Sequence, residues 1–141
     1  MNEWSFQLYS ARNHPPLSST LQLLAELGYT QVEGFGGLYG QAASLLQDLD
    51  RNGLTMPTGH FDLAMLEEPD QALPIIETLG VKAVICPHLA VEQRPSSAAG
   101  WKQLAETLNE VAKPYQAAGL GFGWHNHDFE FVALENGQTP M

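Results

Sequence analysis

The sequence predicts an α/β protein in which strand–helix units repeat around a parallel sheet. Two observations lead to this prediction. Short apolar runs alternate with longer segments whose apolar residues recur at helical spacing. A glycine follows each helical segment just before the next apolar run, at Gly28, Gly53, Gly80 and Gly119. Successive parallel strands need a helical crossover, so this order predicts right-handed β-α-β units, arranged as an open doubly wound sheet or as a (β/α)8 barrel.

The individual elements follow from the same patterns. Strands are expected over 5–10, 30–35, 54–60 and 81–88, and a fifth is expected to begin after Gly119 and to run into the polar residues before Phe131. Helices are expected over 17–27, 42–49, 72–79 and 101–115. Pro57 interrupts the third strand, which must be short or bulged there, and Pro114 should kink or end the last helix. No Gly-x-Gly-x-x-Gly fingerprint follows the first strand, which weakens a dinucleotide-binding fold.

Composition sets limits on the class of protein. The 141 residues are expected to form one domain, 1–141, and 44% apolar with 16% charged residues is ordinary for a globular chain. The net charge of -10 opposes the approach of a polyanion, so no nucleic-acid partner is expected. No signal peptide and no membrane-spanning run is recognisable. The single cysteine, Cys86, is expected to be a small buried residue in a strand. Because it cannot form an internal disulfide, it fits a reducing cytoplasm.

The histidines gather at one kind of position. On this assignment all five lie at or just after the carboxyl end of a strand: His14, His60, His88, His125 and His127. These strand ends open on one face of a parallel β/α protein, where the connecting loops build the site. His14 is expected to be a loop residue, whereas His60 and His88 are expected to point into a shared mouth. His125 and His127 should share a strand face, a spacing that suits joint metal ligation or contact with a polyol.

Carboxylates lie close to these histidines. Glu33 lies near the end of the second strand among apolar neighbours, where an unpaired charge is costly, so it should meet a cation or a polar partner. Asp128 and Glu130 alternate with two phenylalanines, which would put both carboxylates on the same side of a strand. Glu130, inside this apolar frame, is the better candidate for a general base or metal ligand. Asp62, just past His60, is expected to cap a helix.

The motifs together have a family resemblance. The segments FQLYSAR (6–12), GYTQVEGF (28–35), GHF (59–61), PHL (87–89) and WHNHDFEF (124–131) resemble the sugar phosphate isomerase/epimerase group of the xylose isomerase-like TIM barrels. The resemblance implies a barrel that binds one divalent cation, Mn, Mg, Co or Zn, at its mouth. It further implies that the cation polarises the carbonyl of a small sugar or polyol while carboxylates move a proton through an enediolate.

The resemblance also implies roles for particular residues. Glu130 and His60 are the expected catalytic residues, and His127 with Glu130 the expected metal ligands. Contacts with the substrate are expected from the remaining side chains of the mouth: Glu33, His88, His125 and Trp124. The chain departs from the family pattern at the fifth strand, where His125-Asn126-His127 replaces an acidic metal ligand.

The number of strands limits these expectations. The family's remaining ligands, an Asp, a His and a Glu, come from strands six to eight, and a complete (β/α)8 barrel needs about 250 residues. The chain is therefore expected to be an incomplete, N-terminal portion of the barrel with about five of eight strands. An isomerase or epimerase is the first functional reading. The alternatives are an inactive sugar-binding or interaction module and a dehydratase of a cyclic polyol or keto acid.

Incomplete closure also predicts association. An open barrel exposes two strand edges and its interior, so the chain is expected to form a homo-oligomer or to be completed by a missing C-terminal half.

Overall fold

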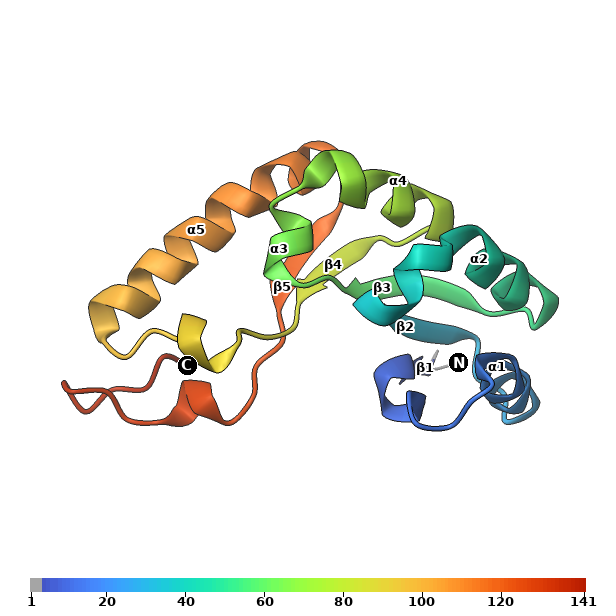
Figure 1. Ribbon diagram of the computed structural model, residues 1–141, viewed down its shortest axis with the longest axis horizontal. Coiled ribbons are helices and arrows are strands. Elements are labelled where there is room, and N and C mark those ends of the chain that lie inside the picture. The colour runs from blue at the N-terminus through green and yellow to red at the C-terminus, as the bar shows by residue number, and fades with distance from the viewer. Residues whose placement is uncertain (1–3) are drawn as a thin grey trace.

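One parallel sheet organises the molecule. The computed structural model describes residues 4–141 and contains five strands that pair in sequence order, each parallel to its neighbour (Figure 1). The strands are β1 (Ser5–Gln7), β2 (Gln31–Phe35), β3 (Thr55–His60), β4 (Ala83–Cys86) and β5 (Gly121–Trp124). The predicted β/α class is confirmed. The order has no reversal, so of the two predicted arrangements it matches a barrel and not a doubly wound sheet.

The helices cover one face of this sheet. Figure 1 shows them along the outer side of the curved strands, as in a barrel. The α-helices are α1 (Leu17–Glu26), α2 (Ala42–Arg51), α3 (Leu63–Leu66), α4 (Pro69–Leu79) and α5 (Ala98–Ala117). The short 3-10 helices are η1 (Leu8–Ala11), η2 (Gly36–Gln41), η3 (Val91–Gln93) and η4 (Phe129–Phe131). Within residues 4–141, no helix is both long and apolar enough to cross a membrane.

Local capping explains several helix ends. The Asp62 side chain accepts a hydrogen bond from the backbone N–H of Met65, 2.9 Å away, so the predicted cap is confirmed at α3. Gly80 ends α4 in the left-handed conformation at φ 69°, which costs glycine little. The α5 helix continues past Pro114 to Ala117, so of the two predicted effects of Pro114, an end to the helix does not occur.

The fifth strand is shorter than the sequence predicts. β5 ends at Trp124, and His125 and His127 lie in the loop that follows it. The residues expected to continue the strand form η4, because the Glu130 carboxylate accepts hydrogen bonds from the Trp124 side chain and from the His127 backbone N–H. The segment therefore folds back onto the strand end. The prediction that His125 and His127 share a strand face, like that of Asp128 and Glu130, is wrong.

The outward-facing side chains of the strands make the core against the helices. Burial alternates along β2 and β4, as one covered face requires. Cys86 is fully buried there, and burial raises the pKa of its thiol to about 11, so the predicted role as a small buried residue agrees with the structure. Tyr115 of α5 is also fully buried and donates a hydrogen bond to the Leu66 carbonyl, 2.8 Å away. Other core members are Leu21, Leu24, Val32, Leu45, Leu49, Met56, Ala72, Ile76, Leu79 and Val84.

A bulge in β3 determines which of its side chains point to the inner face of the sheet, away from the helices. Gln31 of β2 lies opposite Thr55, but Glu33 lies opposite Thr58, so two steps along β2 match three along β3. The irregularity falls between Thr55 and Thr58, the interval that contains Pro57, so the predicted bulge is confirmed. Because side chains alternate along a strand, the extra residue brings Thr58 and His60 to the inner face of the sheet, beside Glu33.

Gly59 sits where a side chain has no room. A Cβ there would approach the Tyr39 hydroxyl more closely than real atoms do and would lie 3.0 Å from Phe61 Cε2. We expect Gly59→Ala to lower the free energy of unfolding by about 1–3 kcal/mol, because the buried Tyr39–Phe61 stack must move. Urea denaturation measures this. Gly40→Ala is the control, since a Cβ at Gly40 meets nothing within 4 Å; equal losses in both variants would contradict the packing argument.

Candidate functional site

A hydrogen-bonded network crosses the first three strands at their carboxyl ends. We call Gln7, Glu33, Thr58 and His60 the Glu33–His60 network. His60 Nε2 lies 3.1 Å from Glu33 Oε1, and the Thr58 hydroxyl donates to Glu33 Oε2 over 2.7 Å. Gln7 Nε2 lies 3.1 Å from the other ring nitrogen, His60 Nδ1. The expectation that Glu33 meets a polar partner is therefore confirmed.

Strand register positions this network. Gln7 of β1 lies opposite Glu33 of β2, which lies opposite Thr58 of β3. Residues directly opposite on adjacent strands present their side chains to the same face of the sheet. The pairing of the strands therefore makes these three polar side chains neighbours. His60 lies two residues beyond Thr58 and shares its face.

The network holds Glu33 as a carboxylate. The hydrogen bond from His60 is the largest effect and lowers the Glu33 pKa, while partial burial acts in the opposite direction. Hydrogen bonds from Thr58 and Gln7 lower it further. The Glu33 side chain keeps 21% of its surface exposed, so an ionised, oriented carboxylate remains accessible at the edge of the site.

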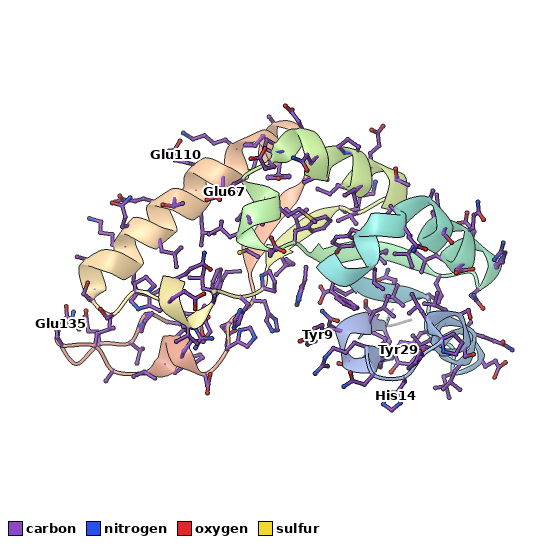
Figure 2. All side chains as sticks on the ribbon, viewed as in Figure 1. Tyr9, His14, Tyr29, Glu67, Glu110 and Glu135 are labelled. Atoms are coloured by element: carbon purple, nitrogen blue, oxygen red, sulfur yellow. The ribbon has the colours of Figure 1, made fainter. Side chains whose placement is uncertain are left out.

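Four of the five histidines line up beside this network. We call His60, His125, His127 and His88 the histidine row. The ring centroids of His60 and His125 are 4.8 Å apart, those of His125 and His127 5.0 Å, and those of His127 and His88 5.1 Å. The row joins the ends of β3, β4 and β5. His14 is not part of it: the residue is exposed on the loop before α1 and points away from the sheet in Figure 2.

Two members of the row are held neutral. Burial is the main cause that lowers the His125 pKa, and the neighbouring His60 and His127 rings lower it further. Burial likewise lowers the His88 pKa, followed by the positive charge of Arg94. A neutral imidazole offers one donor and one acceptor, which suits a hydroxyl-rich ligand.

The row borders a cavity of about 640 Å³ at the carboxyl ends of the strands. All four histidines of the row line it, together with Gln7 and Tyr9. Tyr9 packs edge-on against Phe35, another lining residue, and carries Arg12 over its ring. Concave sites of this size, with a few convergent polar groups, are typical of small-molecule binding. We call this space the mouth cavity.

Arg94 and Phe129 hold the far end of the row. Arg94 Nη2 lies 2.9 Å from His88 Nε2, and the guanidinium group lies 3.9 Å from the centre of the Phe129 ring. The His127 ring stacks on Phe129 at an interplanar angle of 12°. These contacts fix the loop after β5, so His127 keeps its place although it is not in a strand.

Glu130 and Trp124 lie outside the mouth cavity. Glu130 is fully buried; its Oε1 accepts from Trp124 Nε1 and its Oε2 from the His127 backbone N–H, each over 2.8 Å. Both residues instead line a separate cavity of about 430 Å³ beside α5. Catalysis or metal binding by Glu130 and substrate contact by Trp124 stay untested predictions; the observed bonds give both residues a part in shaping the loop.

The described side chains do not form a metal site. Among residues 4–141, no group of three or more His, Cys, Asp and Glu side chains is arranged to hold a metal ion. The contact between the expected ligands His127 and Glu130 is a hydrogen bond from the His127 backbone N–H to the Glu130 carboxylate, and not a pairing of their side chains around an ion. Within residues 4–141, the buried His127 Nδ1 has no hydrogen-bond partner. The donor set of residues 4–141 thus does not fit the implied cation.

Three site residues escaped the sequence analysis. Gln7, Thr58 and Arg94 were given no role, although Gln7 lies within the FQLYSAR segment. Gln7 and Thr58 could have been found from strand register, had the β3 bulge been aligned with β2. Arg94 has no signal in the sequence, because its role depends on how its own loop folds back to His88 and on Phe129 from the loop after β5.

The pH dependence of folding provides a test of the Glu33 contacts. The Glu33 pKa is lower in the folded protein than its ordinary value of 4.5, so ionised Glu33 stabilises the folded state. This contribution is fully present above pH 4.5 and is lost as the pH falls through the lower folded value. Urea denaturation at pH 6 and pH 3 should therefore show a smaller acid-induced loss for Glu33→Gln than for the wild type. Glu26→Gln, at an exposed carboxylate of α1, is the control; identical losses in all three proteins would rule out these contacts.

Comparisons with known proteins agree with this architecture. No protein-family model and no curated protein matches the sequence. A sugar phosphate isomerase/epimerase from Parabacteroides distasonis is 23% identical with a TM-score of 0.80, over 99% of this chain and 56% of that one. The IolI protein with a bound zinc atom is 17% identical with a TM-score of 0.68, over 87% and 51%. D-psicose 3-epimerase, solved in the presence of D-fructose, is 13% identical with a TM-score of 0.61, over 86% and 51%.

These likenesses concern the fold. The chain spans about half the length of the solved structures that it matches. Its five parallel strands with alternating helices correspond to that share of a closed barrel. The chain therefore has the fold of a partial TIM barrel.

Proposed function

We propose that the chain binds a small sugar or polyol in the mouth cavity and moves a proton on the carbon next to a carbonyl, as an isomerase or epimerase does. One observation carries the proposal: an ionised, partly exposed Glu33 is bonded to His60, and His60 and its partner Gln7 line a cavity bordered by the histidine row. The structural neighbours named isomerase/epimerase and D-psicose 3-epimerase support the reaction type.

Glu33 is the proposed base. Its lowered pKa keeps it ionised at neutral pH, so it can accept a proton, as a weaker base than a glutamate with an ordinary pKa. Each carboxylate oxygen has two lone pairs, so the bonds from His60 and Thr58 leave acceptor capacity for the substrate C–H. Proton removal from the carbon beside the carbonyl gives an enediolate, and return of the proton to the neighbouring carbon or to the opposite face gives the isomer or epimer.

The histidines have different parts in this proposal. Both His60 ring nitrogens already face protein groups, so His60 orients Glu33 instead of carrying the proton itself. His125 is exposed at the mouth and neutral, and its ring can donate to the oxygen on which negative charge develops. His88, held at the same wall by Arg94, is placed to bind a substrate hydroxyl.

The proposal assigns no step to a cation. A divalent metal, which the fold resemblance implies, would polarise the carbonyl. The side chains of residues 4–141 do not fit one, so only the reactions of the chain's own groups are proposed.

Isotope exchange tests the reaction. The 141-residue chain, incubated with D-fructose in D₂O with and without added Mn²⁺, should introduce deuterium at the carbon next to the carbonyl, as read by proton NMR. Glu33→Gln should slow exchange by about 100-fold or more, since it removes the base. Glu26→Gln should exchange at the wild-type rate. Absence of exchange by the wild type, or full exchange by Glu33→Gln, would refute the proposed reaction.

A non-catalytic sugar-binding module is the second candidate. It is favoured by the engagement of both Glu33 oxygens and both His60 nitrogens within the protein. On this proposal D-fructose binds saturably in calorimetry, binding weakens in His125→Ala, and no deuterium is introduced. Association through the free edges of β1 and β5 belongs to this second proposal.

A further inference from the structure

The orientation of the Gln7 side chain is fixed from its oxygen end. Gln7 Oε1 accepts a hydrogen bond from the backbone N–H of Tyr9 at 2.5 Å, a contact that only the oxygen of the amide can make. The amide nitrogen must therefore point the other way, and it lies 3.1 Å from His60 Nδ1. Gln7 sits at the end of β1, where the chain turns into η1, so the local backbone sets this direction.

An amide nitrogen can only donate, which decides where the imidazole proton is. Nδ1 has to be the acceptor, so the single proton of a neutral His60 ring is on Nε2. Nε2 lies 3.1 Å from Glu33 Oε1, a carboxylate oxygen that can only accept. The opposite tautomer would place Nδ1–H against the amide N–H and a nitrogen lone pair against the carboxylate. Only one arrangement satisfies every contact.

We propose that Gln7 is a positioning residue that fixes His60 as its Nε2–H tautomer and thereby holds Glu33 in place as the proton acceptor. The tautomer follows from the hydrogen bonds alone. The catalytic consequence rests on the proposed function.

The chemical advantage lies in a neutral donor. An imidazolium beside Glu33 would stabilise the carboxylate more strongly than a neutral N–H and so weaken it as a base. A second proton on His60 would have to enter at Nδ1, where it would face the Gln7 amide N–H. With Gln7 donating to Nδ1, the oriented Nε2–H holds the carboxylate, as an outer partner fixes the tautomer of a metal-binding histidine elsewhere.

Ring nitrogens report the tautomer directly. In the full chain labelled with ¹⁵N-histidine, long-range ¹H–¹⁵N NMR at neutral pH should give His60 an unprotonated Nδ1 and a protonated Nε2. The His60 signals are those that disappear in His60→Gln. In Gln7→Glu, the new carboxylate accepts from Nδ1–H, so Nδ1 should become protonated. Gln47→Glu adds the same charge at an exposed position of α2 and should leave the wild-type pattern.

Each NMR result either supports or overturns the role of Gln7. A proton on Nδ1 in the wild type, or a Gln7→Glu spectrum with the wild-type His60 pattern, would overturn the proposal. If Gln7→Glu fails to fold, Gln7→Leu takes its place: loss of the donor without a charge should give a mixture of tautomers, and an unchanged single tautomer would count against Gln7.

Kinetics separate positioning from simple structural support. In the D-fructose exchange assay, Gln7→Glu should lower kcat by about tenfold or more with little change in KM, because the base and not the binding wall is disturbed. A rise in KM with kcat unchanged would refute the catalytic part. If the wild type shows no exchange, the proposed function fails, and the NMR result still decides the role of Gln7 in fixing the tautomer.

Discussion

The β3 bulge at Pro57 is the constraint on which the site depends. Side chains alternate strictly along a strand, so a single extra residue reverses the face that every later residue presents. Met56 faces the helices before the bulge, and Thr58 and His60 face the inner side after it, opposite Glu33 and Phe35. Without the bulge, strict alternation from Met56 would direct Thr58 and His60 to the apolar core. The bulge thus brings Thr58 and His60 within hydrogen-bonding distance of Glu33, and it keeps the polar imidazole of His60 out of the apolar core.

The two faces of the sheet are consequently stabilised by different interactions. The outer face is apolar and close-packed, and Gly59 lets the Tyr39–Phe61 stack lie directly on β3. The inner face holds an ionised carboxylate in a chain of net charge -10 with no arginine or lysine among its bonded partners. Its stabilisation comes from its contacts with His60 and Thr58 instead. A carboxylate held in this way keeps a full charge to offer to a substrate.

Much of the fold was predictable, and about half of the site. Strand order, the helix cap at Asp62, the irregularity at Pro57 and a polar partner for Glu33 all follow from local pattern and from the cost of an unpaired charge. The end of β5 did not follow, because Glu130 folds the loop back through two hydrogen bonds that alternation cannot reveal. Gln7 and Thr58 were missed because their roles arise from pairing between strands.

The ends of separate strands bring four histidines into one row. The most direct test is the set of nuclear Overhauser effects between histidine ring protons in the full chain. With ring centroids 4.8 to 5.1 Å apart, cross-peaks should join His60 to His125, His125 to His127, and His127 to His88. His14 should show none to the others. Missing cross-peaks between His60 and His125 in a folded, assigned spectrum would contradict the proposed site.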